Sequence, residues 1–371
     1  MNIKSFIDHL KMLGISKYIG VPDSTLSDFC KALNEEDEKG LTYTVAVNEG
    51  SATAIAIGDY LSTKKVSCVF MQNSGIGNML NPLASIANSA IYSIPILFVI
   101  GWRGEYAFQD EPQHAFQGKI TLELLKTLDV DYSILDRNTT EGDFEEYISI
   151  AMECLKNGKQ YAFIVRPGTF YSYKKYLEYE NHFEISRFEA IKKIIDSLDD
   201  SSLIISTTGK ISREFMKVKG DLSNSFLCVG GMGYASAISL GIARNAKTKK
   251  VFCLDGDGSS LMHMGNIAFI GNSGIPNVYH FVLNNLAHES VGGLPTNMEK
   301  VAFSKIATAC NYKKTFYVRY MSELEDVLAN IKMMEGPVMI EIGVKNESCE
   351  ELPRPEDLNH LKKEFMTSLV D

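Results

Sequence analysis

One segment in the second half of the chain has the pattern of a single strand–helix–strand unit. Two apolar runs, Val251–Leu254 and Val278–Leu283, have the length and composition of buried strands, and Met262–Gly271 between them has the pattern of a helix. A helical crossover of this kind joins parallel strands. Asp257 and Asn285 then fall just beyond the carboxyl ends of two parallel strands, which is where open α/β sheets bind ligands.

The residue types at these two strand ends suit a metal-bound phosphate. Gly256 and Gly258 flank Asp257, and glycine lets the backbone turn tightly and approach a charged group. The Asp257 carboxylate and the Asn285 amide oxygen are hard ligands of the kind that Mg²⁺ or Ca²⁺ takes. Gly-Asp-Gly or Asn-Asn alone is more often an ordinary turn. Their joint occurrence across one strand–helix–strand unit favours a binding site.

The same alternation of strands and helices occurs twice along the chain. In the first half the strand-like runs are Tyr18–Val21, Tyr43–Val47, Val66–Met71, Ile96–Ile100 and Ala162–Val165, with a helical pattern at Phe144–Leu155. In the second half they are Leu203–Ser206, Phe226–Val229, Val251–Leu254, Val278–Leu283 and Val338–Ile342, with a helical pattern at Glu323–Met333. Capping boxes at Ser186–Glu189 and Ser322–Glu325 predict two helix starts. We therefore expect an α/β protein with two similar parallel-sheet domains, residues 1–180 including a linker and residues 181–371.

Composition narrows the class of protein. A length of 371 residues favours two domains over one core. The formal net charge of −9 disfavours broad binding to nucleic acid or to an anionic membrane surface. Seven scattered cysteines without a Cys-x-x-Cys, the lack of a signal-peptide pattern and the lack of a membrane-length apolar run predict a cytoplasmic protein.

Short strings spread over both halves resemble the thiamine diphosphate enzymes, and in particular the phosphonopyruvate decarboxylases, with the sulfopyruvate decarboxylases as the near relatives. The strings are Gly-Val-Pro-Asp-Ser (20–24), Asn-Glu-Gly (48–50), Met-Gln-Asn-Ser-Gly-Ile-Gly-Asn (71–78), Gly-Trp-Arg-Gly-Glu (101–105), Asp-Glu-Pro-Gln-His (110–114), Thr-Gly-Lys (208–210), Gly-Asp-Gly (256–258), Asn-Asn (284–285) and His-Glu-Ser-Val-Gly-Gly (288–293). The resemblance implies a pyrimidine-binding domain followed by a diphosphate-binding domain. It also implies a homodimer or homotetramer, with the cofactor between the first domain of one subunit and the second domain of another.

The resemblance assigns residues to the cofactor, thiamine diphosphate, and to its Mg²⁺ ion. Asp257, Asn285 and the Ala287 backbone carbonyl would bind the metal, while Gly230 would offer its carbonyl to the cofactor and Met232 would hold it in a bent shape. The other residues implied to contact the cofactor are Asn73, Ser74, Gly75, Asn78, Thr208, Gly209, Gly256, Gly258 and Ser259.

Glu49 is the strongest candidate for catalysis. It follows the strand Tyr43–Val47 and precedes a helix of small residues, Ser51–Ile57, so its carboxyl group would point out from a strand end. The favourable helix dipole alone could also account for a glutamate here. In the resembling enzymes the matching glutamate hydrogen-bonds N1′ of the aminopyrimidine and favours the imino tautomer that removes the C2 proton of the thiazolium. A partly apolar cleft would raise its pKa toward that role.

The remaining candidates would handle the substrate. A 2-oxo acid with a terminal phosphonate carries about three negative charges, so an acidic protein needs a few well-placed donors to hold it. His114 and His288 are predicted to act in catalysis. The predicted substrate-binding residues are Asp23, Ser24, Arg103, Gln117, Lys210, Arg213, Gly292 and Gly293.

The resemblance implies a carboxy-lyase of phosphonate biosynthesis that converts 3-phosphonopyruvate to phosphonoacetaldehyde and CO₂, with thiamine diphosphate and Mg²⁺. The alternative substrate is sulfopyruvate. A catalytically silent cofactor-binding regulatory module is a further alternative, which the presence of Glu49 disfavours. A nicotinamide dehydrogenase is a distant one, because Gly-Gly-Met-Gly at 230–233 with Ser236 is only a near-miss of a dinucleotide fingerprint.

Overall fold

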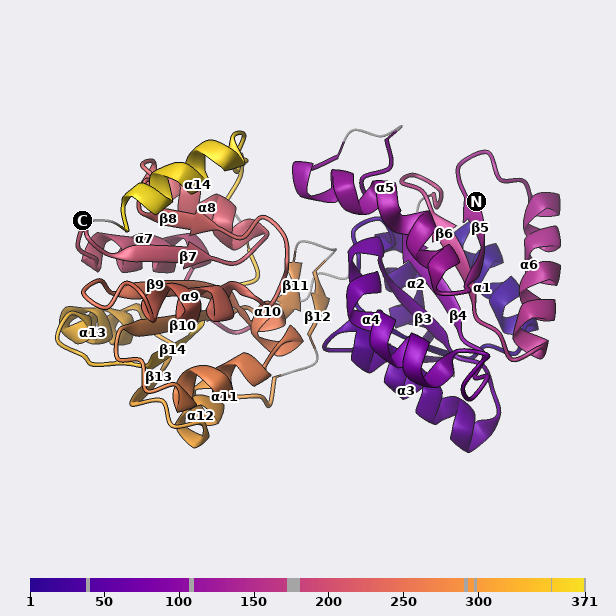
Figure 1. Cartoon of the computed structure of the whole chain (residues 1–371), viewed down its shortest axis with the longest axis horizontal. Helices are drawn as coiled ribbons and strands as arrows, with labels where there is room; N and C mark the ends of the chain where they lie inside the picture. The colour runs from indigo at the N-terminus through magenta and orange to yellow at the C-terminus, as the bar shows by residue number, and fades with distance from the viewer. Residues whose placement is uncertain are drawn as a thin grey trace. The chain divides into compact units, whose positions relative to one another are not determined.

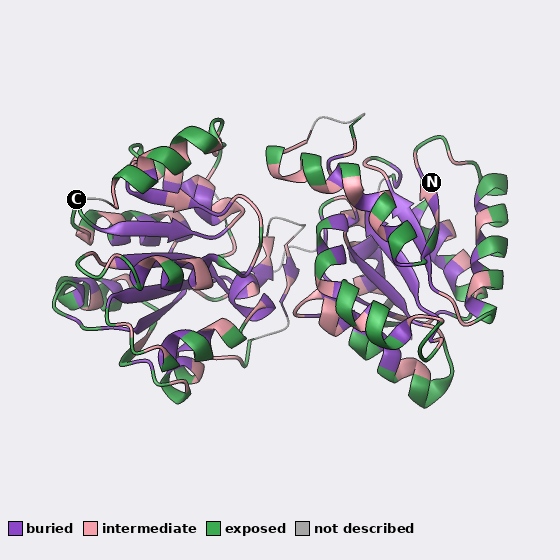
Figure 2. Ribbon diagram, viewed as in Figure 1, coloured by how far each residue is buried: buried purple, intermediate pink, exposed green. Residues whose placement is uncertain are grey.

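The computed structural model describes residues 1–37, 41–106, 110–171, 181–289, 293–296, 299–347 and 349–369. The chain divides into two compact units, Met1–Glu178 and Tyr179–Asp371 (Figure 1). In each unit buried strands form a central sheet, and helices with exposed outer faces cover it (Figure 2). Among the described residues, no helix is long and apolar enough to cross a membrane.

The first unit is built on a six-stranded parallel sheet in the order β2-β1-β3-β4-β6-β5. The strands are β1 (Lys17–Gly20), β2 (Thr42–Val45), β3 (Cys68–Gln72), β4 (Leu97–Gly101), β5 (Asp131–Leu135) and β6 (Tyr161–Val165). The α-helices are α1 (Ile3–Met12), α2 (Ser27–Asp37), α3 (Glu49–Thr63), α4 (Ile76–Pro82), α5 (Pro112–Thr127) and α6 (Glu141–Lys156). A short 3₁₀ turn, η1 (Asn73–Gly75), leads into α4, and a π-helical turn, η2 (Leu83–Ala87), follows it.

The second unit has a six-stranded parallel sheet in the order β13-β14-β10-β9-β7-β8. Its strands are β7 (Leu203–Ser206), β8 (Ser225–Leu227), β9 (Val251–Gly256), β10 (Val278–Asn284), β13 (Lys314–Val318) and β14 (Val338–Gly343), and a separate antiparallel pair joins β11 (Ala287–His288) to β12 (Leu294–Pro295). The helices are α7 (Arg187–Ser197), α8 (Lys210–Lys219), α9 (Ala235–Ala243), α10 (Asp257–Met262), α11 (Gly265–Asn272), α12 (Phe303–Ala309), α13 (Met321–Ile331) and α14 (Leu358–Thr367).

The two sheets have one topology. In each unit the first strand lies between the second and the third, the fourth follows, and the sixth strand lies between the fourth and the fifth. The helical crossovers between parallel strands are those of open α/β sheets. The predicted fold class, two similar parallel-sheet α/β domains, is confirmed.

The sequence analysis missed the same strand in both units, the fifth in chain order. β5 and β13 each form an edge of their sheet. Both have mixed burial along their length, with an exposed first residue in each case. Their exposed positions carry polar residues such as Asp131 and Lys314, so these two strands lack the continuous apolar run by which the other strands, including the edge strands β2 and β8, were found.

Two helix boundaries also differ from the prediction. The helix expected at Met262–Gly271 is two helices, α10 and α11, because the backbone leaves the helical conformation at His263. The first of these helices, α10, begins at Asp257, directly after β9. Ser186 does cap α7 through the Glu189 N–H, at 3.3 Å. The box predicted at Ser322 is wrong, because α13 begins earlier and is capped at Tyr320 by Glu323.

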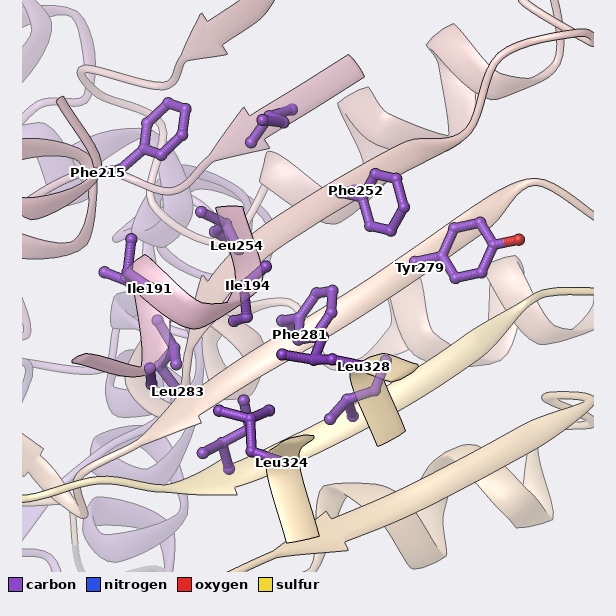
Figure 3. Close-up of a cluster of buried hydrophobic side chains, with 14 of the residues drawn as sticks. Ile191, Ile194, Phe215, Phe252, Leu254, Tyr279, Phe281, Leu283, Leu324 and Leu328 are labelled. Atoms are coloured by element: carbon purple, nitrogen blue, oxygen red, sulfur yellow. The ribbon is translucent and has the colours of Figure 1, made fainter. Parts of the chain in front are cut away.

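One hydrophobic core of the second unit lies on one face of its sheet, and apolar side chains such as Val282 are also buried on the other face. Figure 3 shows Phe252 and Leu254 of β9 beside Phe281 and Leu283 of β10, packed under side chains of α7, α8 and α13 such as Leu328. Since strand side chains alternate between faces, the residues between these, Cys253, Asp255, His280 and Val282, face the opposite side of the sheet.

We predict that Phe281→Ala lowers the free energy of unfolding by about 3–5 kcal/mol, because the ring is fully buried and its removal leaves a cavity. Chemical denaturation followed by circular dichroism measures the change. Phe269→Ala is the matched control, since Phe269 on α11 is 60% exposed and its truncation should change stability by about 0.5 kcal/mol or less. Equal losses in the two variants would contradict the core assignment.

Candidate active site

Four predicted residues of the first unit follow the carboxyl ends of four neighbouring strands. They are Asp23 after β1, Glu49 after β2, Asn73 after β3 and Arg103 after β4. These strands are parallel and adjacent in the order β2-β1-β3-β4, so the loops that follow them share one edge of the sheet. Hydrogen bonds join the loops: Gln72 donates to Asp23 at 2.6 Å, and the Asn73 amide donates to the Arg103 carbonyl at 2.9 Å.

The Glu49 carboxyl group is held in a defined position at the start of α3. It is 5% exposed, and the Asn78 amide donates to its Oε2 at 2.7 Å. Burial raises the pKa of Glu49, and the Asn78 hydrogen bond opposes that rise in part. A buried carboxyl group with a raised pKa suits a residue that must hold and share a proton near neutral pH.

Gly75 provides the space that the Glu49 carboxyl group occupies. A Cβ atom at Gly75 would lie 2.4 Å from Oε1 of Glu49. The φ of Gly75 is −75°, which any residue adopts, so the position requires a glycine for space and not for backbone conformation. Gly75 and Asn78 therefore both position the Glu49 carboxyl group. From the sequence they were predicted to contact the cofactor.

Asp23 and Arg103 form a second polar group at this edge. Burial raises the pKa of Asp23, against hydrogen bonds from Gln72 and the charge of Arg103. The Arg103 guanidinium donates from Nε to Asp110 Oδ2 at 2.7 Å, from Nη2 to Asp110 Oδ1, and from Nη1 to Ser24 Oγ at 2.8 Å. The predicted substrate cation Arg103 is thus paired with an acid, Asp110, that the sequence analysis did not single out.

Asn73 and Ser74 are engaged with protein groups. Asn73 is buried, its Oδ1 accepts from the Arg103 N–H at 3.1 Å, and its amide also donates to Thr121 at 2.9 Å. Ser74 is exposed and donates to Gln72 at 2.7 Å. Asn73 therefore fixes the backbone of the loop that carries Arg103.

His114 and Gln117 lie half-buried in the first turns of α5. Within the described residues, the buried Nδ1 of His114 has no hydrogen-bond partner. Burial lowers the pKa of His114, and the nearby charge of Arg103 lowers it further. Gly104, with φ +75°, lets its loop approach the start of α5, because a Cβ there would lie 1.9 Å from the His114 carbonyl oxygen.

In the second unit the predicted cofactor residues again follow neighbouring strand ends. Thr208 and Gly209 follow β7, Gly230 follows β8, Asp257 follows β9 and Asn285 follows β10. The order β10-β9-β7-β8 makes these loops neighbours. Leu283 of β10 pairs with Gly256 of β9 in register, so the two strands end at nearly the same level.

Asp257 is a buried carboxylate without a described positive partner. It is 4% exposed, and Thr296 Oγ1 donates to its Oδ2 at 3.3 Å. Burial raises the pKa of Asp257 to about 7, and the groups that oppose this rise are neutral donors, including the Leu286 N–H. A bound cation would supply the missing positive charge, so this carboxylate fits a divalent metal.

Thr296 links Asp257 to the turn at Leu286, which lies between the other two predicted metal ligands in the sequence. Leu286 has φ +60°, and its N–H donates to Asn284 Oδ1 at 3.2 Å. Asn285 is 5% exposed, and its Oδ1 accepts from the Ala287 N–H at 3.2 Å. Thr296, which bonds Asp257, also donates its N–H to the Leu286 carbonyl at 2.9 Å. The residues present therefore fit the hard-oxygen donor set of Mg²⁺.

The side chains of two further predicted residues, Met232 and His288, meet at Gly258. A Cβ there would lie 3.2 Å from Cε1 of His288 and 3.3 Å from Cε of Met232. Burial lowers the pKa of His288 to about 4, so the ring is neutral at physiological pH. Gly258 therefore allows the two side chains to close around the start of α10.

Two residues, Thr208 and Ser259, have hydroxyl groups that are predicted to contact the diphosphate. In the structure, both hydroxyl groups form hydrogen bonds to other protein groups. Thr208 Oγ1 donates to the Val229 carbonyl at 2.9 Å. Ser259 Oγ is 2.8 Å from Thr207 Oγ1 and accepts from the Gly233 N–H at 3.1 Å. Both side chains thus tie loops together.

Lys210, a predicted substrate cation, is held by a glutamate that the sequence analysis missed. Its Nζ is 2.7 Å from Oε1 of Glu289, and Glu289 also pairs with buried Arg187. Burial alone would raise the pKa of Glu289, but Arg187 and Lys210 outweigh it and lower the pKa. Arg187 also forms two 2.8 Å bonds to Glu214. No local signal marks this network, because its members are far apart in the sequence.

Three predicted substrate residues remain, and one of them lies outside the described residues. Arg213 is half-buried on α8. Gly293 has φ +72° and precedes β12. Gly292 lies outside the described residues.

Comparisons with known proteins show the family to which the chain belongs. A model of the thiamine pyrophosphate enzyme, N-terminal TPP binding domain, matches residues 3–125, and a model of the C-terminal TPP binding domain matches residues 208–342. Thiamine pyrophosphate is a synonym of thiamine diphosphate. The chain belongs to the thiamine pyrophosphate enzyme family.

Similar proteins narrow the enzyme class. A phosphonopyruvate decarboxylase from Streptomyces viridochromogenes is 31% identical over 92% of this chain and 88% of its own length. One from Streptomyces hygroscopicus is 30% identical over 94% and 88%. A sulfopyruvate decarboxylase from Methanosarcina acetivorans is 24% identical over 97% and 96%. The family and the enzyme class predicted from the sequence, a thiamine diphosphate-dependent carboxy-lyase, are confirmed.

We predict that Gly75→Ala lowers kcat about 100-fold, because the new methyl group displaces the Glu49 carboxyl group by an ångström or more. Steady-state kinetics measures the loss. Gly77→Ala is the matched control, since a Cβ at Gly77 in α4 meets nothing within 4 Å. If the two alanine variants had the same activity, Gly75 would not position Glu49.

We predict that Glu49→Gln gains stability relative to the wild type as pH rises above 4.5, the ordinary pKa of a glutamate. The folded-state pKa of Glu49 is raised above its usual 4.5, so the stability that the protonated group contributes is lost as pH rises through the folded pKa. Glutamine does not titrate and keeps that contribution. Denaturation of both proteins across pH measures the difference, with exposed Glu145→Gln on α6 as the control. A gap that does not widen with rising pH would contradict the raised pKa.

Proposed function

We propose that the protein is a thiamine diphosphate- and Mg²⁺-dependent decarboxylase that converts 3-phosphonopyruvate to phosphonoacetaldehyde and CO₂, as an enzyme of phosphonate biosynthesis. The observation that carries the catalytic part is the buried Glu49 carboxyl group, held by Asn78 against Gly75 at a strand end. The choice of substrate is supported by the names of two relatives that match more than nine-tenths of the chain.

Asp257, the Asn285 side chain and the Ala287 carbonyl would hold Mg²⁺, and the loops at 208–209 and 256–259 would surround the diphosphate. When bound, thiamine diphosphate supplies a carbon nucleophile for the keto carbon and accepts the electrons released with CO₂. Glu49 would hold a proton at N1′ of the aminopyrimidine, a role supported by its burial and raised pKa. Gly230 and Met232 would support the cofactor, with Met232 beside the start of α10.

We propose that His114 and His288 act on the substrate in the neutral form, which their lowered pKa values favour. Arg103 is the best-supported anchor for the phosphonate. Its bonds to Asp110 and Ser24 use three of the five donors of a guanidinium. The two that remain, on Nη1 and Nη2, could bind an anion while Asp110 keeps the group in place.

The other proposed substrate residues are Asp23, Gln117, Lys210, Arg213, Gly292 and Gly293. Lys210 would act as part of its ion pair with Glu289, so it would orient an anion more than attract one by net charge. We also propose a cytoplasmic homodimer or homotetramer whose cofactor is bound at the subunit interface. The resemblance to the thiamine diphosphate enzymes, whose N-terminal and C-terminal domain models both match the chain, supports this proposal.

Sulfopyruvate is the second candidate substrate, since a sulfopyruvate decarboxylase matches nearly the whole chain. Its terminal sulfonate has the same anionic oxygens but a lower charge than a phosphonate. Arg103 could bind either group, so the geometry alone does not favour the sulfonate.

We predict that the purified protein with thiamine diphosphate and Mg²⁺ forms phosphonoacetaldehyde from phosphonopyruvate, and that its kcat/KM for sulfopyruvate is lower. Product analysis with both acids measures this. Asp257→Ala should lose Mg²⁺-dependent cofactor binding, because it removes a metal ligand, and Glu49→Gln should bind cofactor but lose turnover. Preference for sulfopyruvate would overturn the substrate, and cofactor binding without turnover of either acid would favour a regulatory module.

A further inference from the structure

Asp255 is a buried acid that neither the motif analysis nor the proposed mechanism uses. It is the last side chain of β9 before the Gly256–Gly258 turn, and it is fully buried. It faces the side of the sheet opposite the core of Figure 3. A buried carboxylate needs hydrogen-bond donors on both oxygens, so its partners show what it organises.

Three protein groups from two strands and one helix surround the Asp255 carboxylate. The Gly256 N–H donates to Oδ1 at 3.0 Å, and Ser260 Oγ donates to Oδ2 at 3.1 Å. His280 Nε2 on β10 lies 3.2 Å from Oδ2. Both oxygens of the carboxylate therefore have protein partners, which connect Asp255 to β10 and to the first turns of α10.

Ser259, next to Ser260 on α10, links the start of this helix to the two neighbouring loops. Its hydroxyl lies 2.8 Å from Thr207 Oγ1 and accepts from the Gly233 N–H at 3.1 Å. Thr207 belongs to the loop after β7, and Gly233 belongs to the loop after β8. Asp255 therefore anchors the start of α10 to β10 through Ser260 and His280, and the adjacent Ser259 joins the same helix start to the loops after β7 and β8.

We propose that Asp255 and His280 are positioning residues that fix the spacing of the cofactor-binding loops at 207–209, 230–233 and 256–259. The inference rests on the proposed function for the identity of the ligand. The physical basis is the anchoring of α10. Side chains anchor the side of α10 that faces into the protein, so the backbone of the 256–259 turn stays in a fixed position for the diphosphate.

A metal cluster is the alternative use of these residues. Cys253, Asp255 and His280 are all buried, and their ligand atoms lie within 4.8 Å of one another. The hydrogen-bond network favours the positioning role, because the Asp255 oxygens and the His280 Nε2 already satisfy each other, and the Nδ1 of His280 lies 3.4 Å from the Tyr312 hydroxyl.

The test is calorimetric titration of thiamine diphosphate, with excess Mg²⁺, into the wild type and the variants Asp255→Asn and His280→Gln. We expect the dissociation constant to rise about 10- to 100-fold in Asp255→Asn, as is usual when a supporting hydrogen bond behind a metal–ligand site is lost. Glutamine can donate from its amide as Nε2 does, so His280→Gln should lose less. The kcat at saturating cofactor should change far less than the cofactor dissociation constant in both variants.

Tyr279→Phe is the matched control for stability. Tyr279 precedes His280 on β10, faces the other side of the sheet, and donates to the Met334 carbonyl at 2.6 Å. This variant should lose thermal stability but keep wild-type cofactor affinity. If Asp255→Asn does not fold, His280→Gln carries the comparison.

Three outcomes separate the possibilities. Wild-type affinity in folded Asp255→Asn and His280→Gln would overturn the inference. A large loss of affinity in Cys253→Ser, which leaves the hydrogen-bond network intact, would overturn it in favour of a metal cluster. A wild type that binds no thiamine diphosphate would instead refute the proposed function.

Discussion

Parallel strand pairing is the constraint on which the rest of this structure depends. Because β9 and β10 pair in register and end together, the turn that follows one strand meets the turn that follows the other. Asp257 and the Leu286 turn share the hydrogen-bond partner Thr296 for this reason. Asp23, Glu49 and Arg103 likewise depend on where β1, β2 and β4 end along one edge of the sheet, in which β3 separates β1 from β4. Backbone hydrogen bonds between the strands thus determine where the proposed catalytic and metal-binding side chains can meet.

The site carries a thermodynamic cost that the sheets must offset. Glu49 and Asp257 are buried carboxyl groups whose pKa values burial raises, which means that their charged forms are unfavourable in the folded protein. Around them, Gly75 supplies empty space and Asn78 supplies a neutral donor. The Asp255 carboxylate, by contrast, has protein partners on both oxygens, one of which is His280. The acids proposed for chemistry are therefore held by neutral donors against the effect of burial, while the acid that supports the loops has a histidine partner.

The sequence predicted the central strands and the residues at their ends, since both leave local signals: apolar runs, and glycine beside a carboxylate or amide. It did not predict β5 and β13, whose partial exposure removes the apolar run. It also missed the break at His263, because the helical pattern continues across it. Partners such as Asp110, Glu289 and Arg187 were missed for a different reason. A charged residue looks the same in a sequence whether it meets water or a second charge, and only the folded chain brings Arg187 to Glu289.

The repeated topology has a consequence for how such a gene can be organised. Within the described residues, every strand pairing of each sheet joins strands of the same unit, so neither sheet borrows an edge from the other. Severing the polypeptide between the units would leave all of those backbone ladders intact in two separate products. Fission into two genes, or fusion of two into one, is thus an evolutionary step that this architecture permits without redesigning either half.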